Sequence, residues 1–224
     1  MRFLCLHGKG TNSRIFKQQT AALRYELGES HSYDFVDGPH VWEMNPDLDE
    51  FVMGEENTFA ICDPASPSSC LEAMENIERY IAAEGPFDGI MTFSQGTSIA
   101  LGWLIKRQLE AKGGKPWKLP FKIGVFFSNP WGVYDGQALE QGQIAYMYSP
   151  TFEGLLDFPT AHIWGSADKD QAMAEMLSNS CVAEKRSVCV HTRGHEIPAD
   201  INTVISMAKT INRAIVRAES MESS

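Results

Sequence analysis

The chain has 224 residues, with 19 basic side chains against 29 acidic ones and a formal net charge of −10. This length is enough for one α/β domain with a sizeable core, and no shift in composition indicates a second domain. The acidic balance argues against a nucleic-acid partner, and no basic run offers contact with a membrane surface. We therefore expect a single domain over residues 1–224.

The amino terminus and the cysteines indicate where the protein works. The first apolar run is interrupted at His7, too early for a secretory signal, and no stretch is long enough to span a membrane. The five cysteines are odd in number and lack CxxC spacing, which indicates neither disulfides nor a zinc site. We expect a cytoplasmic protein without metal or cofactor. Its cysteines are expected to be small buried side chains, above all Cys5 and Cys189.

The first quarter of the chain predicts a strand, a glycine-rich loop, a helix and a second strand. Residues 3–6 form an apolar run that ends in His7-Gly8-Lys9-Gly10. A helical period follows over 13–27, and residues 32–36 read as a strand. Periodicity then fails over about 38–68. Long irregular stretches in compact domains are commonly functional, so this one is a lid or pocket wall, or else a packed surface loop.

The remaining chain alternates between helices and strands. Helices are predicted from Ser68 or Ser69 to 83 and over 95–111, 169–178 and 200–219; strands are predicted over 87–93, 121–127, 160–164 and 187–191. A second irregular and aromatic-rich segment occupies 128–159. Such alternation is typical of a mostly parallel central sheet with helices on both faces.

The residues around Ser94 form the most informative stretch. A buried strand is followed by Thr92-Phe93-Ser94-Gln95-Gly96 and then by a helix. This order matches the G-x-S-x-G nucleophile elbow, in which a strained turn exposes the serine hydroxyl, except that threonine replaces the first glycine. On this stretch alone, Ser94 is either a nucleophile or simply the N-cap of the helix.

Two further reactive residues are predicted at the ends of later strands. Asp168 follows the strand 160–164 and His195 follows the strand 187–191. The carboxyl ends of parallel strands form one edge of a sheet, where ligands bind, and the order Ser, Asp, His is that of α/β-hydrolases. Asp168 could instead cap its helix, with Asp170 as a rival acid. The rival histidines are His7, His31, His40, His162 and His191, of which His162 and His191 are expected in the core and His7 beside Gly8.

Each of these residue types has a chemical role in acyl transfer. A neutral imidazole, here His195, takes the proton of the serine as its oxygen attacks, and a carboxylate, here Asp168, fixes the orientation of that imidazole. The oxyanion that forms needs preorganised donors, for which the backbone amides of Lys9 and Gln95 are placed. Ser94, Asp168 and His195 are therefore the predicted catalytic residues.

The chain resembles the FSH family of serine hydrolases, a group within the α/β-hydrolase superfamily that is common in fungi. The resemblance rests on Leu4-Cys5-Leu6-His7-Gly8-Lys9-Gly10, Phe93-Ser94-Gln95-Gly96, Trp164-Gly165-Ser166-Ala167-Asp168 and Gly194-His195-Glu196-Ile197-Pro198. It implies a minimal α/β-hydrolase fold, with Ser94 as nucleophile, Asp168 as acid and His195 as base. Two residues depart from the family pattern. Thr92 stands where the family usually has glycine, and Arg193 stands where a glycine often precedes Gly194-His195.

The resemblance also implies a class of reaction. Members of the family hydrolyse esters or thioesters, and several are similar to thioesterases that release a polyketide acyl chain from the carrier domain of a fungal synthase. We therefore expect an acyl ester or thioester substrate and, as a protein partner, such a carrier domain. A general short-chain carboxylesterase and a non-catalytic binding protein on a hydrolase scaffold remain alternatives.

Overall fold

A parallel sheet forms the centre of the molecule. In the computed structural model, which describes residues 1–46, 57–148 and 150–222, six parallel strands lie in the order β10-β9-β6-β5-β1-β2. Their bounds are β1 Arg2–Leu6, β2 Ser32–Val36, β5 Gly89–Phe93, β6 Ile123–Phe127, β9 Thr160–Gly165 and β10 Arg186–His191. The expected α/β class, with a mostly parallel sheet, is confirmed.

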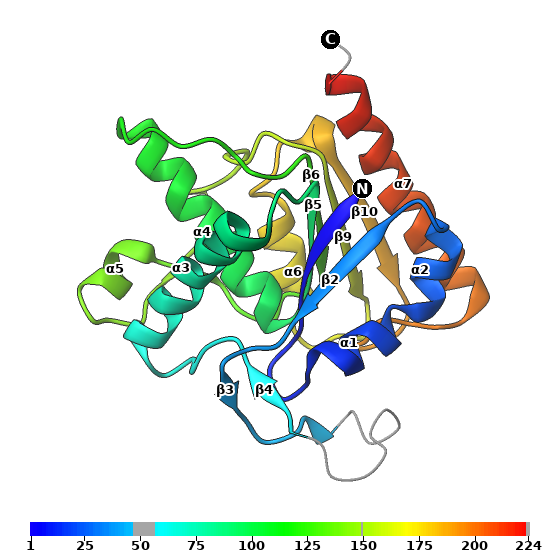
Figure 1. Cartoon of the computed structure of the whole chain (residues 1–224), viewed down its shortest axis with the longest axis horizontal. Coiled ribbons are helices and arrows are strands. Elements are labelled where there is room, and N and C mark those ends of the chain that lie inside the picture. Colours follow the sequence, from blue (N-terminus) through cyan, green and yellow to red (C-terminus); the bar gives the residue numbers. More distant parts are fainter. Residues whose placement is uncertain (47–56, 149, 223–224) are drawn as a thin grey trace.

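Helices cover both faces of this sheet (Figure 1). One face carries α3 (Pro67–Glu84), α4 (Gln95–Lys112) and α6 (Gln171–Ser178). The other carries α1 (Ser13–Gln19), α2 (Ala21–Leu27) and α7 (Ile201–Glu222). None of the helices in the described ranges is long and apolar enough to cross a bilayer.

Successive side chains of each strand point to opposite faces of the sheet, so the core is divided into two apolar clusters. In β1, Leu4 packs toward α3 and α4, whereas Phe3 and Cys5 pack toward α1 and α7. Such strands are buried on both faces, so they are nearly continuous apolar runs, as β5 and β6 are. Burial on both sides fixes the register of these strands and hence the positions of the turns at their ends.

One predicted helix is divided in two, and another begins one residue earlier than predicted. The helix expected over 13–27 is two helices, because the chain breaks at Thr20, whose hydroxyl donates to the Phe16 carbonyl at 2.8 Å. The helix expected to begin at Ser68 or Ser69 begins at Pro67, because Ser66 is the N-cap and its oxygen accepts the Ser69 amide. The other helices and strands agree with their predicted ranges to within a few residues.

The two segments expected to be irregular contain short paired elements. The first holds the antiparallel pair β3 (His40–Val41) and β4 (Phe59–Ala60), and residues 47–56 lie outside the described part. The second, in which residue 149 is likewise not described, holds β7 (Val133–Tyr134), α5 (Gly136–Glu140) and β8 (Tyr146–Met147). Outside these segments, a short 3-10 helix, η2 (Ala183–Lys185), lies between α6 and β10.

Candidate active site

Ser94 occupies a sharp turn between β5 and α4. Its φ of 53° and ψ of −117° lie outside the usual regions for a side-chain-bearing residue, so the turn is strained. The helix that follows lies so close to β1 that a Cβ at Gly96 would come within 2.6 Å of the Leu6 carbonyl oxygen. Only glycine fits there, which explains the one glycine of the elbow pattern that this chain retains.

Thr92 fits the turn because its hydroxyl has a partner. Its Oγ1 lies 2.9 Å from Thr97 Oγ1, and the Thr97 hydroxyl donates to the Phe127 carbonyl at 3.0 Å. The Thr92 hydroxyl therefore donates to Thr97. The same Phe127 carbonyl accepts the Ser94 amide at 3.1 Å. The threonine that departs from the elbow pattern is thus part of a hydrogen-bonded support beneath the serine.

The structure brings Ser94, His195 and Asp168 together. His195 Nε2 lies 2.9 Å from Ser94 Oγ, and His195 Nδ1 lies 2.7 Å from Asp168 Oδ2. The Asp168 side chain is 1% exposed and that of His195 is 22% exposed, so the carboxylate is shielded while the imidazole still reaches solvent. Asp170 contributes only its backbone amide, which donates to Asp168 Oδ1 at 2.9 Å.

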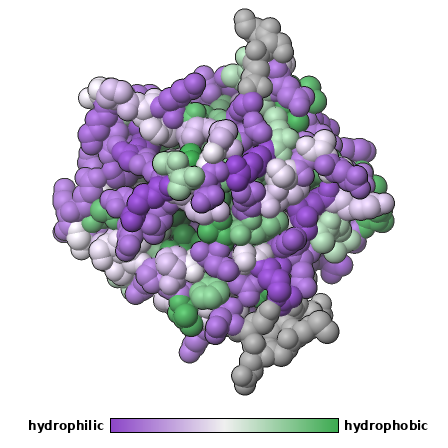
Figure 2. All heavy atoms as spheres, in the orientation of Figure 1, coloured by the Kyte–Doolittle hydropathy of each residue, from purple (hydrophilic) through white to green (hydrophobic). Residues whose placement is uncertain are grey.

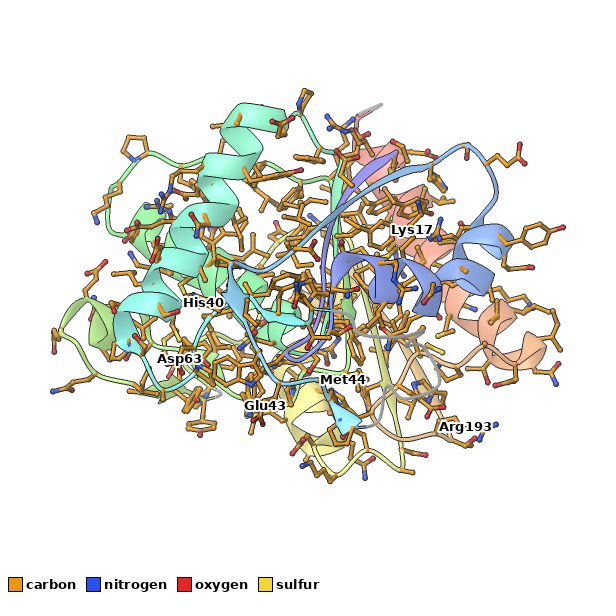
Figure 3. The ribbon with its side chains drawn as sticks, turned by 60° about the horizontal axis from the view of Figure 1, so that its bottom comes forward. Lys17, His40, Glu43, Met44, Asp63 and Arg193 are labelled. Atoms are coloured by element: carbon orange, nitrogen blue, oxygen red, sulfur yellow. The ribbon has the colours of Figure 1, made fainter. Side chains whose placement is uncertain are left out.

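The loops that carry Asp168 and His195 are packed directly against each other. A Cβ at Gly165 would lie 2.0 Å from the Arg193 carbonyl oxygen, and the Ala167 amide donates to that oxygen at 3.1 Å. The backbone of Arg193 therefore supports the loop that carries Asp168, while the exposed Arg193 side chain points outward (Figure 3). This explains why a side chain is tolerated where the family pattern often has glycine.

The remaining histidines have other partners. His7 is buried, with Nδ1 2.6 Å from the Gly8 carbonyl oxygen and Nε2 accepting the Gly38 amide, so its predicted role in bracing the loop is confirmed. His162 and His191 are buried as expected. His40 Nε2 lies 2.9 Å from Ser69 Oγ, and His31 Nδ1 lies 3.1 Å from the amino terminus.

The two residues predicted to supply oxyanion donors both belong to segments that contact or adjoin Ser94. Gln95 follows Ser94, and its buried side chain accepts the Ile61 amide at 2.8 Å and donates to the Cys62 carbonyl at 2.9 Å. Lys9 follows Gly8, where a Cβ would lie 3.1 Å from Ser94 Cβ. The glycine-rich loop therefore passes directly beside the serine.

Aromatic side chains from both irregular segments meet at Lys9. Its Nζ lies 5.4 Å from the ring centre of Trp42 and 5.6 Å from that of Trp131. Their aromatic character marks both tryptophans as pocket-lining candidates in the sequence. Their convergence on one ammonium has no local signal, because it depends on the pairing of segments far apart in the chain.

The five cysteines, all within the described residues, are free. Four are buried as expected, and Cys62 and Cys70 have sulfur atoms 3.5 Å apart. Burial raises the pKa of the Cys5 thiol well above its ordinary value. Cys189 is only half-buried, because β10 is an edge strand and α7 covers its side chain incompletely.

An apolar groove lies away from the serine. It has a volume of about 410 Å³ and lies between α3 and strands β1 and β2, with Leu6, Val36, Ile77 and Tyr80 in its walls. In Figure 2 hydrophobic residues gather near the centre of the view, between α3 and β2. Neither Ser94 nor His195 lines this groove, so it is distinct from the candidate site.

Comparison with known proteins identifies the family. The sequence model of the family described as Serine hydrolase (FSH1) matches residues 1–207. The chain is 35% identical to "Esterase FPY3" of Fusarium mangiferae over 97% of this chain and 98% of that one. It is 28% identical to "Probable esterase tazC" of Aspergillus terreus, covering 94% and 90% of the two chains.

Solved structures show the same fold. SOBER1 of Arabidopsis thaliana superposes with a TM-score of 0.55 at 19% identity, covering 96% of this chain and 99% of that one. The Bacillus cereus carboxylesterase gives a TM-score of 0.53 at 14% identity, covering 95% and 87%. The expected α/β-hydrolase fold is confirmed, and the chain belongs to the FSH1 family of serine hydrolases.

Proposed function

We propose that Ser94, His195 and Asp168 form the catalytic triad of this hydrolase and that it cleaves acyl esters or thioesters through an acyl-enzyme. One observation carries the proposal: a strained serine is joined to a shielded carboxylate through one imidazole, with contacts of 2.9 and 2.7 Å. These distances are within the reach needed for proton transfer.

The arrangement accounts for each step of the reaction. His195 Nε2 takes the proton of the Ser94 hydroxyl as Oγ attacks the substrate carbonyl, and the amides of Lys9 and Gln95 bind the oxyanion. The imidazolium, stabilised by Asp168, then protonates the departing alcohol or thiol. Water repeats the sequence on the acyl-enzyme with His195 as base, releasing the acid and restoring Ser94.

We further propose a thioester-linked polyketide acyl chain as substrate, released from the carrier domain of a synthase. The family resemblance and the fungal relatives support this assignment. The segments 38–68 and 128–159, within one domain over 1–224, would wall the acyl pocket with half-buried aromatic rings such as Trp42, Trp131 and Tyr146. The free cysteines support a cytoplasmic place of work.

The names of the relatives favour a second candidate, a general carboxylesterase. A non-catalytic binding protein has lost its sequence-based support. Its one indication was Thr92, and that hydroxyl is accommodated within the elbow.

A fluorophosphonate probe tests the proposed nucleophile. We expect one adduct per chain by intact mass, located on Ser94 by peptide mapping and absent from Ser94→Ala. A folded protein that takes up no probe would contradict the proposal. Turnover of N-acetylcysteamine thioesters against 4-nitrophenyl esters of the same acids then distinguishes thioesterase from carboxylesterase.

A further inference from the structure

Lys9 lies on the loop that passes beside Ser94. Its ammonium lies between the indoles of Trp42 and Trp131. All three side chains are half-buried, so the ammonium is partly desolvated yet still reachable from outside. Cation–π contact stabilises such a charge without using its N–H donors.

Both indoles are held in place through their backbone. The Trp42 amide donates to the Thr58 carbonyl at 2.8 Å, and the Trp42 carbonyl accepts the Thr58 hydroxyl at 2.7 Å. The Trp131 carbonyl accepts Asn129 Nδ2 at 2.7 Å, and Asn129 in turn accepts the Ser98 hydroxyl from α4. The backbone that carries each ring is therefore fixed, and both rings lie beside the ammonium.

The Lys9 side chain is not needed to hold its own loop. The Gly10 amide donates to the Phe59 carbonyl at 2.9 Å, and the Gly10 carbonyl accepts the Asn45 amide at 2.9 Å. At the start of the loop, the His7 imidazole contacts the Gly8 carbonyl oxygen. The glycine-rich loop is thus fixed by its backbone. The Lys9 ammonium is therefore not required to hold the loop.

Among the described residues, the hydrogen-bonding capacity of the ammonium is also unused. In the part of the chain that the structure describes, Lys9 Nζ forms no salt bridge with a carboxylate and donates no hydrogen bond. A partly desolvated ammonium with unmet donors binds an anionic oxygen strongly, because charge-assisted hydrogen bonds gain from the lower dielectric.

We propose that Lys9, framed by Trp42 and Trp131, is a specificity-determining subsite that binds a negatively charged group on the substrate. The inference rests on the proposed function, since it assigns a substrate class to the same site. The anion is either a carboxylate on the acyl portion or a phosphate on the leaving group. Both groups present anionic oxygens to an ammonium.

Matched substrates separate these two positions. The acyl arm compares mono-4-nitrophenyl adipate and suberate with 4-nitrophenyl hexanoate and octanoate, which have the same chain lengths and leaving group. The leaving-group arm compares hexanoyl-coenzyme A with hexanoyl-N-acetylcysteamine. In each arm the measured quantity is the ratio of kcat/KM for the anionic substrate to that for the neutral one, so general damage to the site cancels.

We expect Lys9→Met to lower this ratio by about 10-fold to 100-fold in at least one arm, as loss of a charge-assisted contact does. Lys9→Arg should keep most of the preference, because a guanidinium also stacks between indoles and binds anions. Lys17→Met is the control, since Lys17 is an exposed lysine on α1 (Figure 3) and should leave both ratios unchanged.

The inference and the proposed function fail in different ways. If wild type takes up the fluorophosphonate on Ser94 but Lys9→Met leaves both ratios unchanged, the subsite is wrong and the hydrolase mechanism stands. If wild type takes up no probe and turns over no ester, the proposed function itself is wrong.

Discussion

Two neighbouring strands end in the same unusual way but with different surroundings. Ser94 follows β5 and Ser128 follows β6, with φ of 53° and 40°, and they are the two non-glycine residues of the described chain with positive φ. The two turns adjoin each other. The Phe127 carbonyl accepts the Ser94 amide, and Ser128 is the next residue.

The side chains of the two serines differ. Ser94 Oγ contacts His195, which lies on a loop beyond β10 and is backed by Asp168. Ser128 Oγ is buried and finds no hydrogen-bond partner among the described residues. A histidine does lie near it, since His162 and Ser128 line the same cavity of about 10 Å³, but His162 Nε2 contacts Thr160 Oγ1.

The contrast indicates what the proposed nucleophile has in addition to a strained turn. Strain exposes or redirects a hydroxyl, whereas activation needs a base that can both receive and release a proton. Burial lowers the pKa of His162 to about 3, so that imidazole stays neutral and cannot shuttle protons near pH 7. His195 lies partly exposed beside a carboxylate.

The largest effect should come from removing one serine and not the other. Ser94→Ala is expected to lower kcat by about 10,000-fold or more, because it removes the attacking atom. Ser128→Ala should leave kcat within about twofold, because it deletes only an unpaired hydroxyl. Steady-state turnover of a 4-nitrophenyl ester measures both, and equal losses in the two variants would break the comparison.

A second prediction concerns the carboxylate that distinguishes the two histidines. Asp168→Asn should lower kcat by about 1,000-fold to 10,000-fold, because the amide cannot stabilise the imidazolium and favours the wrong tautomer. Asp170→Asn is the matched control, since only the backbone of Asp170 contacts Asp168. If Asp170→Asn proved the more damaging change, the assignment of the acid would be wrong.

A third prediction uses the buried histidine. The folded pKa of His162 is about 3 against an ordinary value of 6.5. Below pH 6.5 the unfolded chain therefore binds a proton that the folded chain does not. Folding stability should fall by about 1.4 kcal/mol per pH unit from this group as pH drops from 6.5 toward 3.

His162→Gln should remove that contribution. Urea unfolding of both proteins in steps from pH 7 to pH 4 measures the two slopes, and protonation of carboxylates common to both proteins cancels in their difference. Parallel slopes would show that His162 takes up protons in the folded state and that burial does not keep it neutral.

The smallest effect concerns the support beneath the active turn. Thr92→Val keeps the shape of the side chain but removes the hydroxyl that donates to Thr97, and should destabilise the fold by about 1 kcal/mol. Activity should change little, since Thr97 still donates to Phe127. Thermal melts and turnover of the same preparation measure the two quantities, and a large loss of kcat without a change in melting temperature would give Thr92 a direct part in the site.

The sequence predicts the sheet and the three side chains that meet at the candidate site well, because both depend on short-range patterns. The apolar run 87–93, the turn at Ser94 and the helix after it are local, and parallel strands must present Asp168 and His195 at one edge. The α/β alternation then limits the topology to few choices.

Other features depend on contacts that the sequence does not display. The break at Thr20 interrupts an apolar period that continues through Ile15, Phe16, Leu23 and Leu27, so no local pattern marks it. The strands β3 and β4 have two residues each and are defined only by pairing with each other. The placement of Trp42 beside Lys9 follows from that pairing.

The direct contact between Gly165 and the Arg193 backbone has a practical consequence. The loops that carry Asp168 and His195 support each other without any contact from Ser94. Ser94→Ala should therefore leave Asp168 and His195 in their positions. Such a protein is suited to trapping: incubated with a cell extract, it would retain uncleaved ligand long enough for mass spectrometry to read its identity.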